Sequence, residues 1–342
     1  MAFRCFGYRN GAYRCHMSLA AQTSVSPTPS SRSLTVLGRP IGFWTRFALL
    51  WLMAITVTGA AVRLTGSGLG CTDWPTCSVN EELDAPAFHG TIEFGNRVIS
   101  GLAIIPVVAA WVIARRSRPD LKVTIIGLVL GFIGQVVLGM LVTRTELDPR
   151  VVLGHFLLSI VLIFLGVVLD YRARHATAGK VALSAEQKSE RKHSYLVVAA
   201  ATIVIFVGTL VTGSGPHTGS EASGEPIPRL GFDIFEITRI HSVLAWVLVA
   251  SIVAGLWRNR PGQPSSPTST AAYTWYMRIG ALAVLQGAIG YLQFFTGVPV
   301  ELVALHIAGS VALWTAASWY ALRTTFPPAD DHAPERAVEV GP

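Results

Sequence analysis

Three histidines carry the clearest chemical signal in this chain. His155, His241 and His306 each lie within a long apolar stretch, where ionisable side chains are costly and are therefore candidates for function. Imidazoles that face one another across a helix bundle hold haem iron in membrane cytochromes. Zinc would require three or four clustered ligands, and no such cluster with cysteine lies within an apolar stretch. The sequence therefore favours haem iron, with His241 and His306 as a pair and His155 as a further ligand.

Glu93, Asn96 and Arg97 form a polar group in the first half of the chain. Their spacing of i, i+3 and i+4 places them on one face of a helix. A carboxylate beside an iron pocket in a low dielectric suits proton transfer, which makes Glu93 the candidate catalytic residue. The alternative is an ion pair with Arg97 or Arg63. Asn96 is expected opposite His155, although an amide is a poor ligand for iron.

Cys71 and Cys77 lie close together between the first two apolar stretches. We expect this segment on the outer side of the membrane, where thiols can be oxidised, and we expect one local disulfide there. Closing so short a loop stabilises a protein little, so a redox or loop-shaping role is at least as favoured as a stabilising one.

The two halves of the chain repeat one spacing pattern. Gln135 precedes His155 by 20 residues, Gln286 precedes His306 by 20, and a glycine follows each glutamine after four. The Thr-Gly-Ser-Gly motif also occurs twice, at 65–68 and 212–215. Such glycine motifs are common in membrane helices, but two independent spacing matches favour a duplication of four helices. The two glutamines would contact haem substituents or join neighbouring helices.

The elements that carry these residues are membrane helices. Hydrophobic residues make up 51% of the 342 residues, charged residues only 14%, and the mean hydropathy is +0.49. This composition excludes a soluble multidomain enzyme and a small disulfide scaffold. We predict an all-α integral membrane protein with eight transmembrane helices in two duplicated four-helix bundles. The expected spans are Phe43–Val62, Ile92–Ala114, Val123–Val142, Val151–Tyr171, Tyr195–Val211, Phe235–Trp257, Met277–Phe295 and Glu301–Tyr320.

The distribution of basic residues predicts the orientation in the membrane. Of the 27 Lys and Arg residues, 21 fall on the side that holds both termini and six on the other side. The positive-inside rule therefore places both termini in the cytoplasm. The net charge of +7 needs no nucleic acid to explain it.

The chain divides into five parts on this basis. We expect a basic disordered cytoplasmic arm at the N-terminus, for which a transit peptide or an over-long translation start is the alternative. An N-terminal bundle, a cytoplasmic linker, a C-terminal bundle and a disordered tail follow. The boundaries are 1–42, 43–171, 172–194, 195–322 and 323–342.

Taken together, these residues resemble the haem A synthase family. The resemblance covers residues 43–322 and includes the stretch Thr-Gly-Ser-Gly-Leu-Gly-Cys-Thr-Asp-Trp-Pro-Thr-Cys at 65–77, Ile-Glu-Phe-Gly-Asn-Arg at 92–97, and the three histidines. It implies oxidation of the C8 methyl group of haem O to the formyl group of haem A, for use in terminal oxidases. It also implies a plasma membrane location, because the cysteine pair resembles that of bacterial members.

The resemblance assigns a role to each half. His241 and His306 would hold a resident haem b, and the N-terminal half would bind the substrate haem near Glu93 and His155, with Asn96, Arg97 and Gln135 in its pocket. Candidate partners are haem O as substrate, a haem O synthase and an electron donor, within membrane lipid; the oligomeric state is left open.

The chain departs from the family at one position. Family members have a histidine three residues after the glutamate, whereas this chain has Asn96. We therefore expect His155 alone to hold the substrate iron. The alternative functions are a dihaem membrane electron carrier linked to quinone, which would not need Glu93, and a transporter built from repeats, which would not bind pigment.

Overall fold

The computed structural model describes residues 3–7, 13–17, 34–82, 85–175, 183–220, 227–261 and 267–327. The chain divides into two units, Met1–Leu34 and Thr35–Pro342. The first unit contains two antiparallel strands, β1 (Phe3–Gly7) and β2 (Tyr13–Met17). These strands lie within the arm that the sequence predicts to be disordered over 1–42. Much of the rest of that arm lies outside the described residues.

Every regular element described in the second unit is a helix. Eight segments of the described residues are long and apolar enough to cross a membrane, which confirms the predicted all-α membrane fold and the predicted number of spans. The helices are α1 (Ile41–Leu64), α2 (Pro86–Leu102), α3 (Ile104–Ser117), the 3₁₀ turn η1 (Pro119–Leu121), α4 (Lys122–Arg144), α5 (Pro149–Arg174), α6 (Ala185–Ser214), α7 (Ile234–Arg258), α8 (Pro267–Phe295) and α9 (Val300–Thr325).

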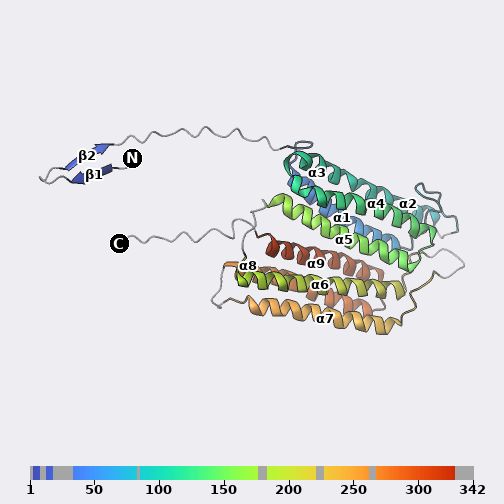
Figure 1. Cartoon of the computed structure of the whole chain (residues 1–342). Coiled ribbons are helices and arrows are strands. Elements are labelled where there is room, and N and C mark those ends of the chain that lie inside the picture. Colours follow the sequence, from blue (N-terminus) through green and yellow to red (C-terminus); the bar gives the residue numbers. More distant parts are fainter. Residues whose placement is uncertain are drawn as a thin grey trace. The chain divides into compact units, whose positions relative to one another are not determined.

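The helices form two groups that follow the two halves of the chain (Figure 1). In the first group α5 packs against α1 and α4, and α1 packs against α3. In the second group α6 packs against α7 and α9, and α8 packs against α9. The groups meet where α9 contacts α5 and α1, and the Trp314 indole nitrogen donates a hydrogen bond to the Ile160 carbonyl across this contact, at 3.1 Å. Buried aliphatic side chains of both groups, such as Val167 of α5 and Val311 of α9, belong to one hydrophobic core cluster.

The second membrane segment is interrupted, although its composition predicts one helix over Ile92–Ala114. Helix α2 ends at Leu102 and α3 begins at Ile104. Pro106 has no amide hydrogen to donate to Leu102, which lies four residues before it, so the helix cannot continue unbroken. The segment also begins earlier than expected because Pro86 occupies the first turn of α2, where proline is favoured.

The linker predicted over 172–194 is largely helical where it is described. Helix α5 continues to Arg174, and α6 begins at Ala185 with a capping box between Ser184 and Gln187. Residues 176–182 lie outside the described residues. Helix α9 continues to Thr325, and residues 328–342 of the predicted disordered tail are also outside the description.

Candidate functional site

Two half-buried imidazoles face each other in the second half. His241 lies seven residues after the start of α7, and His306 lies six residues after the start of α9. Their ring centres are 6.4 Å apart and the ring planes are inclined at 70°. The Nδ1 atom of each ring is buried and has no hydrogen-bond partner. Both rings therefore retain a nitrogen for a ligand.

A glycine on a neighbouring helix makes room for each of these rings. A Cβ atom built on Gly208 of α6 would lie 3.0 Å from Cε1 of His241, and one on Gly290 of α8 would lie 3.3 Å from Cε1 of His306. Contacts this short would push the imidazoles, because buried side chains are already close-packed. The glycines therefore fix the level at which the two rings lie.

The first half repeats this arrangement around His155. The ring lies six residues after the start of α5, its Nδ1 is buried without a partner, and a Cβ on Gly139 of α4 would lie 3.5 Å from its Cε1. Gln135 donates from Nε2 to the His155 carbonyl at 3.1 Å and to the Ser159 hydroxyl at 2.8 Å. Gln135 therefore joins α4 to α5 through its amide nitrogen, while its Oε1 is buried without a partner.

Asn96 occupies the corresponding place on α2. The Thr58 hydroxyl of α1 donates to Asn96 Oδ1 at 2.8 Å, and a Cβ on Gly59 would lie 3.8 Å from Asn96 Nδ2. A glycine thus faces the Asn96 side chain too. Asn96 is the residue that the sequence predicts opposite His155.

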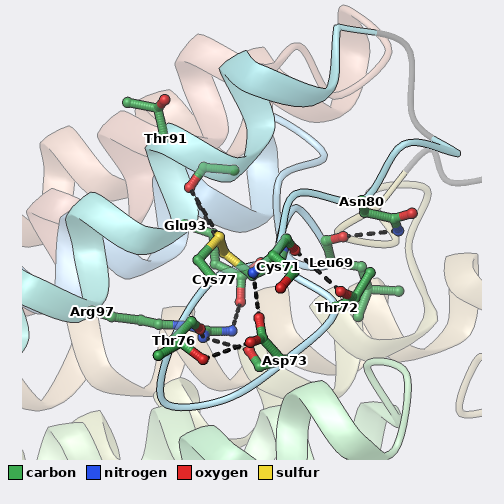
Figure 2. Close-up of a disulfide and its surroundings, with 12 residues drawn as sticks. Leu69, Cys71, Thr72, Asp73, Thr76, Cys77, Asn80, Thr91, Glu93 and Arg97 are labelled. Carbon is green, nitrogen blue, oxygen red and sulfur yellow. Dashed lines mark hydrogen bonds and ion pairs between the residues drawn. A yellow bond between two sulfur atoms is a disulfide. The ribbon is translucent and has the colours of Figure 1, made fainter.

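Glu93 is buried and anchored to the loop between α1 and α2 (Figure 2). Its Oε2 accepts a hydrogen bond from the Cys71 amide at 2.9 Å, and its Oε1 pairs with Arg97 Nη2. Arg97 also donates from Nη1 to the carbonyls of Asp73 and Thr76, both at 2.8 Å. The structure therefore brings Glu93 and Arg97 together as an ion pair that holds the loop onto α2.

A disulfide closes this loop. Cys71 and Cys77 are bonded, as the sequence predicts, with their Cα atoms 4.8 Å apart. Inside the loop Asp73 accepts hydrogen bonds from the Thr76 hydroxyl and the Ser78 amide, and these bonds lower the pKa of the Asp73 carboxyl. The disulfide and the hydrogen bonds to the Asp73 carboxylate thus both shape the loop (Figure 2).

Two contacts of this region are not predicted by the sequence. His89 lies in the first turn of α2, where its Nδ1 is 2.9 Å from the Ser67 hydroxyl. Arg63 reaches from α1 into the second half and donates to the His217 and Thr212 carbonyls. The spacing of residues along the sequence does not predict side-chain contacts between the two halves.

The donor set of the second half fits haem iron. A metal bound to imidazole lies about 2 Å from the nitrogen, so two imidazoles on opposite sides of one iron have ring centres about 6 Å apart. The ring centres of His241 and His306 are 6.4 Å apart, and each ring has a buried nitrogen without a partner. No group of three or more His, Cys, Asp or Glu side chains suited to a metal ion occurs in the described ranges.

Residues 42–318 match the model of the family COX15-CtaA, described as "Cytochrome oxidase assembly protein". This match spans most of the chain. The chain belongs to the COX15-CtaA family. It carries the three histidines and the disulfide loop described above within the matched residues.

Individual relatives in the comparison carry two names. A protein named "Heme A synthase" from Chelativorans sp. (strain BNC1) is 25% identical over 358 residues, which cover 87% of this chain and 96% of the relative. A protein of the same name from Exiguobacterium sp. (strain ATCC BAA-1283 / AT1b) is 27% identical over 223 residues, covering 62% and 70%. A "Protoheme IX farnesyltransferase" of Thermus thermophilus is 42% identical over 83 residues, but the chain spans only 14% of its length.

Proposed function

We propose that this protein oxidises the C8 methyl group of haem O to a formyl group and so produces haem A for terminal oxidases. The observation that carries the proposal is the pair His241 and His306, whose separation suits one iron. Part of this arrangement is repeated around His155 in the first half. The family membership and the relatives named "Heme A synthase" support the same reaction.

The two halves take different roles in this proposal. His241 and His306 hold a resident haem b, which supplies electron transfer when it is bound. His155 holds the iron of the substrate haem, and it does so alone because the Asn96 amide is a poor ligand. Gln135 positions His155 by bonding its carbonyl at 3.1 Å. The duplication thus provides one site for a resident group and one for a substrate.

Glu93 is the proposed proton-transfer residue. In the proposed reaction the methyl group is hydroxylated twice, and each hydroxylation uses one dioxygen, two electrons from the donor and two protons and releases one water; the resulting gem-diol then loses water to give the formyl group. A group that transfers protons is therefore needed near the substrate. The carboxylate is buried, and the Cys71 amide and Arg97 fix both of its oxygens. A carboxylate held in this way needs little reorganisation when the substrate reacts.

Extraction of pigments from cells that produce haem O tests the reaction. Expression of the chain should yield haem A, and Glu93→Gln should lower that yield by about 100-fold or more because the proton-transfer group is lost. The matched control is Glu236→Gln, which removes an exposed ion pair with Arg239 at 2.9 Å and should leave the yield unchanged. A coloured protein without haem A would instead indicate an electron carrier, and a colourless one would indicate a transporter.

We also propose a plasma membrane location with both termini in the cytoplasm, on the strength of the basic residues. A protease site added after Pro342 should be cut in inverted vesicles and protected in intact spheroplasts. Cleavage in spheroplasts would contradict this orientation.

The proposed partners are an electron donor for the resident haem and a haem O synthase that supplies the substrate. A segment similar to this chain occurs within a longer protein named "Protoheme IX farnesyltransferase", which supports the second partner. Cross-linking in membranes should join the chain to that synthase, and its absence from all cross-linked products would argue against direct transfer.

A further inference from the structure

Two arginines from different halves share one acceptor. Arg63 lies in the last turn of α1, and Arg229 lies in the segment between α6 and α7. Both donate from Nη2 to the carbonyl of Thr212, Arg63 at 2.9 Å and Arg229 at 2.7 Å. Two positive guanidinium groups therefore lie side by side at the end of α6.

Among the described residues, the recorded acceptors of this pair are all neutral. Arg63 donates to the His217 carbonyl from Nε at 3.1 Å and from Nη2 at 2.7 Å, and Arg229 also donates to the Gly215 carbonyl. Neither arginine makes an ion pair with a described residue, and Nε of Arg229 is buried without a partner. Burial also lowers the pKa of Arg229. Charges partly withdrawn from water without a counter-ion are costly, and no anion among the described residues pairs with either arginine.

The carbonyl that the two arginines share lies one helical turn beyond the proposed haem site along α6. Thr212 is one helical turn beyond Gly208, to whose carbonyl its hydroxyl donates at 3.0 Å. Gly208 is the residue that faces the His241 ring. One turn of α-helix rises about 5 Å, so the residue whose carbonyl accepts from both guanidinium groups lies roughly that far beyond Gly208 along α6.

We propose that Arg63 and Arg229 bind the propionate carboxylates of the haem held by His241 and His306. This inference rests on the haem binding proposed above. Haem carries two carboxylates on one edge, and the planar guanidinium fork matches a carboxylate in both shape and charge. The unpartnered Nε of Arg229 is a donor available for that purpose.

The site also joins the two halves. Arg63 belongs to the first half and Arg229 to the second, and beside them the Gly68 amide donates to the Gly219 carbonyl at 2.8 Å. A resident haem would therefore hold α1 against the loop that precedes α7. Loss of this haem should loosen the contact between the halves.

Titration of the purified, haem-depleted protein with protohaem and with its dimethyl ester tests the proposal. The ester lacks the negative charges but keeps the iron. We expect the wild-type protein to bind protohaem about tenfold more tightly than the ester, because charge-assisted hydrogen bonds are lost with the ester. The double variant Arg63→Gln/Arg229→Gln should bind both compounds equally, and at the affinity of the ester for wild type. Arg144→Gln removes an exposed arginine at the end of α4 and should keep the preference.

The outcomes separate this inference from the proposed function. Equal binding of the two compounds by the wild-type protein would overturn the carboxylate site while leaving haem binding intact. Binding of neither compound by the wild type would overturn both. Since the ester does not use the arginines, its unchanged affinity in the double variant shows that this variant is folded. A double variant that keeps the tenfold preference would also overturn the site.

Discussion

Three imidazoles of this protein leave a buried Nδ1 atom without a partner, those of His155, His241 and His306. A buried polar atom without a hydrogen bond costs about 1–3 kcal/mol, which natural folds tolerate mainly at functional positions. The same three residues are those that the sequence analysis selects as iron ligands. At this scale the residue types were predictable, because polar side chains stand out within apolar helices.

The partners of these residues were less predictable. The sequence presents Glu93 either as a proton-transfer residue or as an ion-pair partner, and the structure shows its carboxylate paired with Arg97. The pair was foreseeable because the two residues are four apart on one helix. The bond from the Cys71 amide was not, because it depends on how the disulfide loop folds back onto α2.

Asp73 makes the disulfide loop sensitive to acid. The hydrogen bonds from Thr76 and Ser78 lower its pKa in the folded loop, so its contribution to loop stability is present above the unfolded pKa of about 4 and is lost as the pH falls through the folded value. At pH 7, Asp73→Asn should speed reduction of the Cys71–Cys77 disulfide by a soluble phosphine roughly twofold to fivefold. The ratio of the variant rate to the wild-type rate should approach one as the pH falls through the lowered pKa of Asp73 in the folded loop.

Glu81→Gln provides the control for this effect. Glu81 is an exposed carboxylate outside the disulfide loop, and its replacement should leave the reduction rate at the wild-type value. A ratio for Asp73→Asn that stays constant from pH 7 to acid would show that the carboxylate does not stabilise the loop.

At the scale of elements, glycines on neighbouring helices set the positions of the three histidine rings. Gly208→Ala places a methyl group 3.0 Å from Cε1 of His241. We expect this variant to bind haem roughly tenfold more weakly, as is typical when the residues that orient a metal ligand are changed. Absorbance titration with haem measures the effect.

Gly287 offers a matched control on a membrane helix. An added Cβ there meets nothing within 4 Å, so Gly287→Ala should keep the wild-type haem affinity. Equal affinities for the two alanine variants would mean that the close contact at Gly208 does not determine where the His241 ring lies.

Helix boundaries show where local sequence signals were sufficient. The number of membrane segments followed from apolar runs of about 20 residues. The break between α2 and α3 has a local cause in Pro106 and was predictable in principle. The long start of α6 was harder to predict, because its polar first turns before Tyr195 resemble a solvated loop in composition and are capped by Ser184.

At the scale of the whole molecule, the duplication was visible in the spacing of the motifs. The packing of the two groups was not, because residues that face lipid and residues that face another helix are both apolar. The contact of α9 with α5 and α1, and the reach of Arg63 to the His217 carbonyl, therefore come only from the structure. These contacts make the two halves one molecule with a repeated site.

Absorption and electron paramagnetic resonance spectra of the purified protein test most directly whether His241 and His306 hold one haem iron. We expect the wild type to show a low-spin haem with two histidine ligands. His241→Ala and His306→Ala should each abolish that signal, and His155→Ala should keep it because its ring lies on α5 in the other half. A low-spin signal that survives His306→Ala, or a wild-type protein without bound haem, would contradict the assignment.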